Sequence, residues 1–421
     1  SASPASITLN WPSFSGATGY AVFRKVKTAS TWTQLGTAAG GATQYVDNTA
    51  ATGTAYEYKV VRTTSSAGTG YGCIASGIQV SMDDYRGKMV LLVDNTFTTS
   101  LATPITQLIN DLRADGWVVL RSDVSRTASV SSVRSTIQSY YNADPTNVRA
   151  VFLLGHVPVP YSGQLNPDGH GDHSGAWPAD GYYGEMNGTW TDNSVNTTSA
   201  QDTRNRNTPG DGKFDQSDYP GGIELQVGRV DMSNLESFQY YLGQNEQTIL
   251  SNYLTKLHNF KIKQTTPTFR GAVFDNFEDL NIAGCGYRSI SANVGTANLT
   301  DFNPNGTAFG SSVNNQSYLW TYSCGGGTWI SSSNVASTDE LCTSVTWGGV
   351  FNLMMGSYFG DWDCQNNLMR GVLGRGAALV NCFAGIPNAW FHHMGMGDNI
   401  GYSMWASMNN GSVYAPQSCG Y

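Results

Sequence analysis

The sequence predicts a multidomain protein, with an N-terminal all-β sandwich followed by a three-layer α/β domain. Residues 1–82 contain short alternating or β-branched runs that are separated by Gly, Ala, Thr and Asp at even spacing. From residue 89 onward, apolar strands alternate with helical stretches, which favours a parallel sheet covered by helices. The 421 residues also suffice for two or three domains with substantial cores.

The N-terminal domain, residues 1–82, is expected to consist of strands and turns. The strand-forming runs are SITLNW, GYAVFRKV, TWTQLG, AYEYKVVRTT and GCIASGIQVSM. The pattern resembles a fibronectin type III module, with Trp11 at the core Trp of its second strand and Tyr56 and Tyr58 in its later Tyr-x-Tyr strand. The resemblance places the first strand before Ser1, so we expect the chain to be a processed or trimmed part of a longer precursor. Residues 83–88 read as a polar linker.

The C-terminal domain, residues 89–421, is expected to alternate buried strands with helices, and a polar insertion at 161–222 interrupts it. The strands are expected at 88–95, 117–123, 148–156, 223–231, 269–276, 317–323, 348–357 and 377–385. The helices are expected at 101–115, 129–143, 235–260, 364–373 and 401–408.

Composition excludes some functions. Charged residues make up 13% of the chain, about half of the roughly 25% usual in soluble domains. The net charge of -8 and the lack of a basic tract argue against nucleic acid as a partner. No apolar run approaches the roughly 18 residues of a transmembrane helix. The weakly charged, Tyr-rich composition is typical of a secreted or cell-surface protein, whose partners would be other proteins, further copies of itself, or glycans.

The seven cysteines form no CxxC pair, which argues against a zinc ribbon. They are Cys73, Cys285, Cys324, Cys342, Cys364, Cys382 and Cys419. Because five of them lie between 324 and 419, we expect one or two disulfides in an oxidising compartment, with the pairing left open. The N-glycosylation pattern occurs at Asn187, Asn196, Asn298, Asn305, Asn315 and Asn410, and chance matches are common in a chain rich in Asn, Ser and Thr.

The strongest resemblance to a known protein family lies at two strand ends near the C-terminus. The segments 317–329 (SYLWTYSCGGGTW) and 348–363 (GGVFNLMMGSYFGDWD) resemble the loops of the gingipain-like, caspase-fold cysteine peptidases. In that family one strand ends in His-Gly and a later strand ends in the nucleophilic Cys. Here Cys324 and Gly325 stand at the place of His-Gly, and Ser357 stands at the place of Cys. The resemblance therefore implies the family's fold with a degenerate catalytic dyad.

Chemistry is expected at these loops, because active sites in open α/β sheets lie at the carboxyl ends of the strands. Cys324 is a candidate nucleophile, with the backbone of Gly325 and Gly326 as a candidate oxyanion hole. Ser357 is a second candidate nucleophile. The candidate bases and their orienting carboxylate are His156, His392, His393 and Asp361. The alternative is that Cys324 is a buried or disulfide-bonded residue and that these histidines are ordinary hydrogen-bonded side chains.

The insertion is rich in Asp, Asn and Gly, which favours a structural Ca²⁺ site. The candidate ligands are Asp180, Asp211, Asp215 and Asp218. Gingipain-like domains bind structural calcium, so the resemblance implies the same cofactor, whereas the alternative is a solvated turn. His170 and His173, with Asp168 and Asp172, could instead hold a transition metal.

The favoured function is that of a secreted or cell-surface pseudoenzyme, which acts without catalysis in adhesion, binding or extracellular assembly, including assembly into a polymer. The alternative is an active cysteine endopeptidase with a rearranged site centred on Cys324. A third interpretation is a glycan-binding or carbohydrate-active protein that uses Trp329, Trp362 and Trp390.

Overall fold

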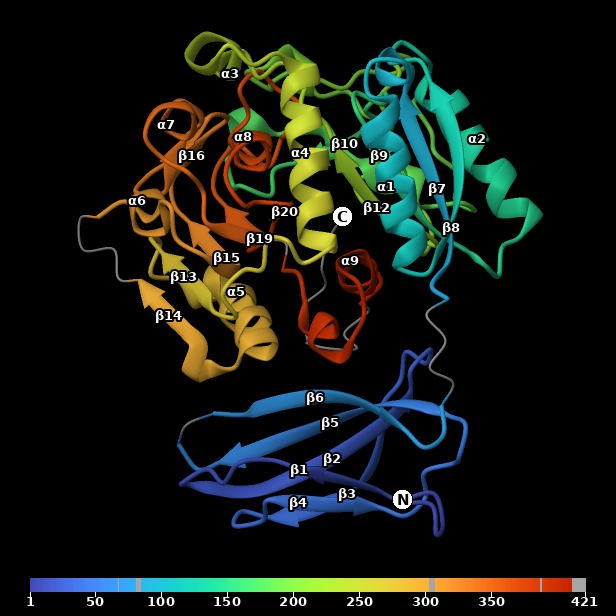
Figure 1. The fold of residues 1–421 in the computed structure, drawn as a ribbon, viewed down its shortest axis with the longest axis vertical. Coiled ribbons are helices and arrows are strands. Elements are labelled where there is room, and N and C mark those ends of the chain that lie inside the picture. The colour runs from blue at the N-terminus through green and yellow to red at the C-terminus, as the bar shows by residue number, and fades with distance from the viewer. Residues whose placement is uncertain (67, 81–84, 303–306, 387, 411–421) are drawn as a thin grey trace. The chain divides into compact units, whose positions relative to one another are not determined.

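The computed structural model describes residues 1–66, 68–80, 85–302, 307–386 and 388–410 (Figure 1). Within these residues the chain forms two compact units. The first unit contains residues 1–80 and 392–398, and the second contains 85–391 and 399–410.

The first unit contains two antiparallel sheets. In one sheet β1 pairs with β4, and in the other the order is β3-β2-β5-β6. The strands are β1 (Ile7–Asn10), β2 (Ala17–Val26), β3 (Thr33–Ala39), β4 (Gln44–Asp47), β5 (Ala55–Thr64) and β6 (Gly70–Gly77). Ile7 and Leu9 of β1 share one apolar cluster with Val22 and Tyr58 of the larger sheet. The two sheets therefore enclose a common core, and η6 (His392–Met396) belongs to the same unit.

The second unit begins with a four-stranded, wholly parallel sheet of order β12-β9-β7-β8. Its strands are β7 (Gly87–Asp94), β8 (Trp117–Val124), β9 (Val148–Leu154) and β12 (Gln226–Val230). Two amphipathic helices, α1 (Ala102–Ala114) and α2 (Val130–Ala143), alternate with the strands. Between β9 and β12 lie a small hairpin and three 3₁₀ turns: β10 (Tyr161–Leu165), β11 (Gly175–Pro178), η2 (Gly171–His173), η3 (Asp180–Tyr183) and η4 (Thr203–Asn205).

A second parallel sheet follows, with the order β14-β13-β15-β19-β20. Its strands are β13 (Gly271–Asp275), β14 (Leu299–Phe302), β15 (Tyr318–Cys324), β19 (Gly349–Met355) and β20 (Val380–Phe383). The helices are α3 (Glu236–Leu242), α4 (Glu246–Lys261), α5 (Leu280–Val294), α6 (Phe309–Val313), α7 (Thr338–Thr343), α8 (Leu368–Gly374) and α9 (Ile400–Met408). The remaining elements are η1 (Asn95–Phe97), η5 (Thr296–Asn298), β16 (Gly327–Thr328), β17 (Ser331–Ser332) and β18 (Ala336–Ser337).

Helix α4 joins the two parallel sheets into one core. Its residues Leu250 and Tyr253 belong to the same buried cluster as Leu91 of β7 and Val350 of β19. The Tyr253 hydroxyl donates to the carbonyl of Leu379 over 2.8 Å, next to β20. The parallel α/β architecture expected from the sequence is therefore confirmed, although it consists of two sheets and not one.

Two other local differences have simple causes. The single helix expected at 235–260 is broken into α3 and α4, because Gly243 ends α3 in the left-handed conformation (φ 63°) and the Asn245 side chain caps α4. Strand β14 was not anticipated, because its four residues alternate too briefly to give a periodic signal.

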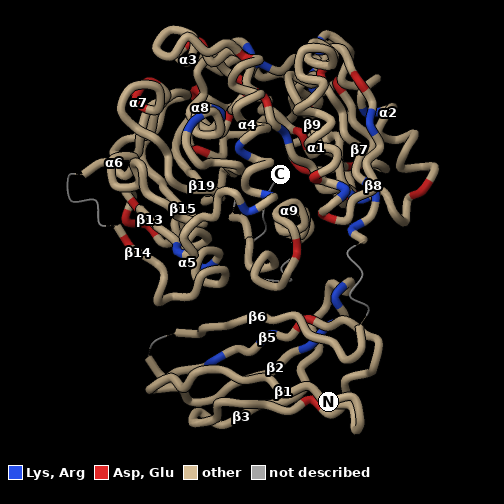
Figure 2. The backbone as a smooth tube through the Cα atoms, in the orientation of Figure 1, with Lys and Arg blue, Asp and Glu red and all other residues tan. Residues whose placement is uncertain are grey.

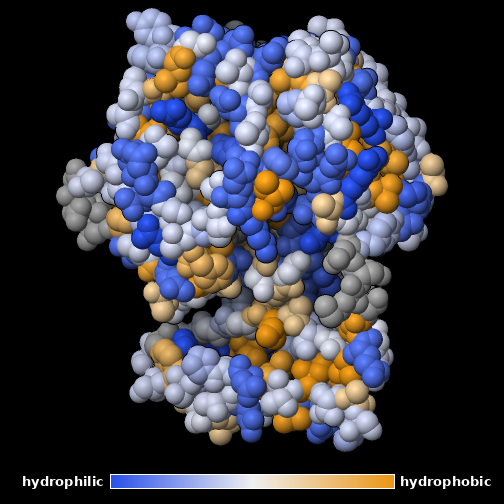
Figure 3. All heavy atoms as spheres, in the orientation of Figure 1, coloured by the Kyte–Doolittle hydropathy of each residue, from blue (hydrophilic) through white to orange (hydrophobic). Residues whose placement is uncertain are grey.

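The small number of charged residues on the surface agrees with the low charged fraction of the sequence. Charged residues are sparse and spread over both units (Figure 2). On the face of the second unit seen in Figure 3, apolar residues form small separate groups among hydrophilic ones. Among the described residues, no helix combines the length and the hydropathy needed to cross a membrane.

Candidate functional site

The loops that follow β15 and β19 lie side by side, because the two strands are parallel neighbours with Cys324 opposite Met355. The Gly325 amide continues this ladder by donating to the Met355 carbonyl over 3.2 Å. Ser357 follows two residues beyond the end of β19. It therefore lies at the carboxyl edge of the sheet, where an α/β protein places its reactive groups.

Ser357 is hydrogen-bonded to His170 of the insertion. The Oγ of Ser357 lies 2.8 Å from Nε2 of His170, and both side chains are half-buried. The His170 ring stacks on Tyr358, with 4.9 Å between ring centroids. Tyr358 itself has a φ of 66°, a left-handed conformation that is unfavourable for a residue with a Cβ. Such strain beside a potential nucleophile is typical of functional sites.

A buried network fastens the loop of His170 to the loop of Ser357. The Asp168 carboxylate accepts the backbone N–H of Tyr358 over 2.9 Å and lies 2.6 Å from Nδ1 of His173. The other ring nitrogen of His173 lies 3.2 Å from Asp361. Because each nitrogen faces a carboxylate oxygen, this arrangement favours the imidazolium form of His173, in which both nitrogens donate. The side chains of Asp168, His173 and Asp361 are almost wholly buried.

Asp361 also forms an ion pair with a second positively charged residue, Arg204. The Arg204 guanidinium and the Trp329 indole both donate to the same carboxylate oxygen of Asp361, the indole over 3.3 Å. Burial opposes ionisation of Asp361, but the hydrogen bond from His173 and the charge of Arg204 outweigh it and lower the pKa of Asp361. Burial likewise opposes the charge on His173, but Asp168 and Asp361 outweigh it and raise the pKa of His173.

Cys324 lies at the end of β15 and is fully buried. Its Sγ lies 3.2 Å from a carboxylate oxygen of Asp275. Burial, together with the charge of Asp275, raises the pKa of Cys324 to about 12. A thiol with such a pKa is almost wholly protonated near neutral pH and is a weak nucleophile.

The structure brings His156 to Asp231 and Ser233, and not to Cys324 or Ser357. His156 follows β9 and bonds to Asp231 over 2.8 Å and to Ser233 over 3.1 Å. The hydrogen bond with Asp231 raises the pKa of His156. His392 and His393 belong to the first unit, whereas Cys324 and Ser357 belong to the second.

The candidate calcium ligands do not gather in the structure. Asp180 forms a two-pronged ion pair with Arg229, and Asp215 accepts backbone N–H groups of residues 193–195. Asp211 accepts the amides of Thr208 and Lys213. Across the described ranges, no three His, Cys, Asp or Glu side chains are arranged to hold a metal ion. Calcium binding therefore stays a prediction from the sequence, because calcium also takes backbone and amide oxygens as ligands.

The structure gives the exposure of the N-glycosylation motifs and the state of the described cysteines. Asn187, Asn196, Asn298 and Asn315 are exposed, and Asn305 lies outside the described residues. Asn410 is 1% exposed and leaves no room for a glycan. No disulfide joins any two of the six cysteines in the part of the chain that the structure describes, and Cys419 lies outside it.

The sequence did not pair Ser357 with His170, because 187 residues separate them. The signal that could have found the pair is the run NPDGHGDH, which concentrates two His and two Asp residues within the insertion. The sequence offers that run only as an alternative transition-metal site. In the structure its residues bond instead to the 357–361 loop.

Comparison with solved structures finds similarity to the crystal structure of the Arg-specific cysteine proteinase gingipain R (RGPB). The sequence identity is 9% and the TM-score is 0.42. The match covers 71% of this chain, and this chain spans 62% of that one. No family model and no curated protein matches the sequence.

Proposed function

We propose that this protein is a serine hydrolase of acyl compounds, with Ser357 as the nucleophile and His170 as the general base. The observation that supports the proposal is the 2.8 Å hydrogen bond between Ser357 Oγ and His170 Nε2 at the carboxyl edge of the second sheet. A hydroxyl and an imidazole at this distance form the pair that activates serine in hydrolases.

In the first half-reaction, neutral His170 carries its proton on Nδ1 and accepts the Ser357 proton at Nε2. The Oγ then bonds to the carbonyl carbon of an ester or amide. His170 returns that proton to the leaving alcohol or amine as the scissile bond breaks, which leaves an acyl group on Ser357. In the second half-reaction, water attacks the acyl carbon and gives a proton to His170. Release of the carboxylic acid returns that proton to Ser357.

Asp168, His173 and Asp361 act in this proposal as positioning residues. The bonds of Asp168 with the Tyr358 amide and of His173 with Asp361 join the 168–173 loop to the 357–361 loop, and the Asp168–His173 bond links the two within the first loop. Hydrogen bonds of this charge-assisted kind are stronger than neutral ones. Because the bonds are buried, they resist screening by salt. Their proposed role is to hold His170 within hydrogen-bonding distance of Ser357.

The test is covalent labelling with a fluorophosphonate probe, which reacts with activated serine. We expect labelling of Ser357 in the intact chain, loss of labelling in Ser357→Ala, and a rate at least about 100-fold lower in His170→Asn. Ser139→Ala and His258→Gln are matched controls on helices α2 and α4, and both should label normally. Labelling that persists in Ser357→Ala would refute the assignment.

A second candidate function is the non-catalytic role in adhesion or extracellular assembly. The observation that favours it is that the amides of Gly325, Tyr358 and Phe359 already donate within the protein, so none of the three is available to an oxyanion. A folded protein that neither reacts with the probe nor turns over ester substrates would support this scaffold function. The order of the β1-β4 and β3-β2-β5-β6 sheets supports a fibronectin type III-like module as the accompanying binding domain.

A further inference from the structure

The edge of the second sheet that carries Ser357 also carries exposed apolar side chains. Phe277 follows β13, and Leu280, which is 72% exposed, begins α5. Ile386, which is 46% exposed, follows β20. Because the strands of this sheet are parallel, the segments that follow their C-terminal ends lie at one edge. We call Phe277, Leu280 and Ile386 the apolar rim.

Strand order places the Ser357 loop between the two parts of the apolar rim. In the order β13-β15-β19-β20, Phe277 and Leu280 follow a strand on one side of β19, and Ile386 follows the strand on the other side. Since neighbouring strands lie about 4.8 Å apart, β20 is one spacing from β19 and β13 is roughly 10 Å from it. Both separations are comparable with the length of a short aliphatic chain attached at Ser357.

The loop after β20 packs against the segments that surround it. A Cβ at Gly385 would lie 2.6 Å from Cγ of Met355, at the end of β19, and 3.1 Å from Ile282 in the first turn of α5. Ile386 is therefore held beside both the strand end that leads to Ser357 and the helical turn that begins with Leu280. Exposed apolar residues that gather in this way are typical of a binding surface, whereas single ones are common everywhere.

The surface between Phe277 and Ser357 is low, because the turn after β15 is Gly325-Gly326-Gly327 and contributes no side chain. Gly326 is exposed, and among the described residues a Cβ there would meet only the Ser333 hydroxyl, at 4.0 Å. A group attached at Ser357 can therefore extend over this turn toward the apolar rim.

The direction of the reaction indicates which part of a substrate would reach the apolar rim. In the proposed reaction His170 gives a proton to the leaving group, so the leaving group lies against the 168–173 loop. The acyl part is bonded to the same carbonyl carbon and points away from His170. The apolar rim belongs to other segments, those after β13 and β20, and is available to the acyl part.

We propose that the apolar rim binds the acyl part of the substrate, and that the Ser357 site acts on esters of aliphatic carboxylic acids. This assignment rests on the proposed hydrolase function. Each methylene that leaves water for the apolar rim favours binding, and the contact persists in the transition state of acyl transfer. The preference for a longer acyl chain should therefore appear in kcat/KM.

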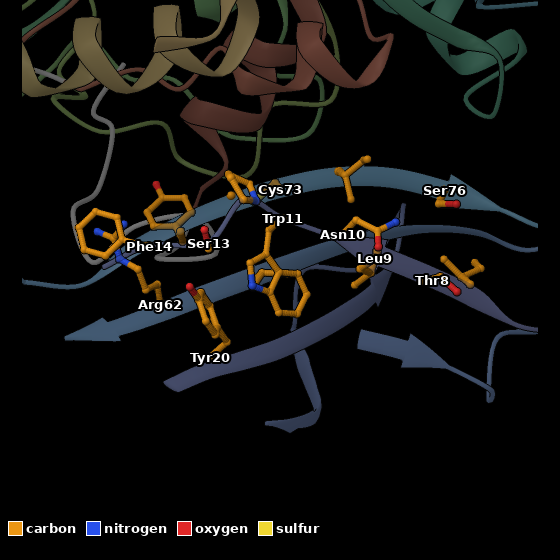
Figure 4. Close-up of a pocket in the computed structure, with 17 residues that line it drawn as sticks. Thr8, Leu9, Asn10, Trp11, Ser13, Phe14, Tyr20, Arg62, Cys73 and Ser76 are labelled. Atoms are coloured by element: carbon orange, nitrogen blue, oxygen red, sulfur yellow. The ribbon is translucent and has the colours of Figure 1, made fainter. Parts of the chain in front are cut away.

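The groove of the first unit is a separate feature. It has a volume of about 630 Å³, and its walls include Leu9, Trp11 and Tyr20 (Figure 4). Ser357 belongs to the second unit, so the acyl assignment concerns that unit alone.

The experiment compares p-nitrophenyl acetate and p-nitrophenyl hexanoate, which share a leaving group and differ only in acyl length. The full chain is used, and the turnover that Ser357→Ala removes is the turnover measured. We expect kcat/KM to be at least about tenfold higher for hexanoate than for acetate. Leu280→Asn and Ile386→Asn should each lower this ratio at least about threefold. Ile262→Asn is the matched control, because Ile262 is 53% exposed but follows α4, and the ratio should stay the same.

The outcomes separate this proposal from the hydrolase function. Hydrolysis of both esters at a ratio near one, or a ratio that neither Leu280→Asn nor Ile386→Asn changes, would overturn the acyl assignment and leave the hydrolase in place. Fluorophosphonate labelling of Ser357 without turnover of either ester would also overturn the acyl assignment. The absence of both labelling and turnover in the folded protein would overturn both proposals.

Discussion

Replacing Asp168 with Asn tests whether the buried network holds the site together. The substitution keeps the size of the side chain but removes the charge that faces Nδ1 of His173, at 2.6 Å. A hydrogen bond to a charged group contributes about 1.5–3 kcal/mol, and the amide of Tyr358 keeps an acceptor in the Asn oxygen. We therefore expect the free energy of unfolding to fall by about 2–3 kcal/mol. Urea titration followed by tryptophan fluorescence would measure the change.

Asp172→Asn is the matched control on the same loop. The carboxylate of Asp172 is exposed and, among the described residues, accepts only the Tyr358 hydroxyl, over 3.1 Å, so its replacement should cost less than about 0.5 kcal/mol. Asp168→Asn should also slow fluorophosphonate labelling of Ser357, because the loop of His170 would lose the charge that holds His173. The reasoning would be refuted if the two variants unfolded at the same urea concentration and labelled at the same rate.

Three further predictions follow from other features. Because the pKa of His173 is raised by folding, protonated His173 contributes fully to the free energy of unfolding below the ordinary His pKa of about 6.5. That contribution is lost as pH rises through the pKa that His173 has in the folded protein. Urea titrations at a series of pH values should show this decline, and the decline should be smaller in Asp168→Asn. Gly243→Ala should lower the free energy of unfolding by about 1–2 kcal/mol in the same titration, because φ at Gly243 is 63° and no nearby atom offers compensating contacts. Chelation with EGTA should leave the melting temperature unchanged, because Asp180, Asp211 and Asp215 bond elsewhere; a clear fall would instead favour the calcium site expected from the sequence.

The sequence was sufficient to predict the elements that depend on local pattern. Both the strands and their C-terminal ends could be predicted from four runs that are apolar over a strand's length and end in Gly or polar residues. These runs are 88–95, 148–156, 317–323 and 348–357. The carboxyl edge of β15 and β19 was likewise predictable as the place of the candidate site, because parallel strands direct their carboxyl ends to one side. Ser357 was therefore identified as a candidate nucleophile, although its hydrogen-bonding partner, His170, was not.

Tertiary structure decided what depends on contacts between distant segments. The sequence favoured Cys324 over Ser357 as the candidate nucleophile, but burial beside Asp275 makes the thiol of Cys324 a weak nucleophile, whereas Ser357 receives His170 from an insertion 187 residues earlier. No periodicity could reveal this pairing, because the loop of His170 has no regular pattern and is held by buried charges. The sequence by itself thus determined the strands and the edge where chemistry is expected. Only the packing of the insertion decided which side chains meet there, because hydrogen bonds between remote residues leave no local signal.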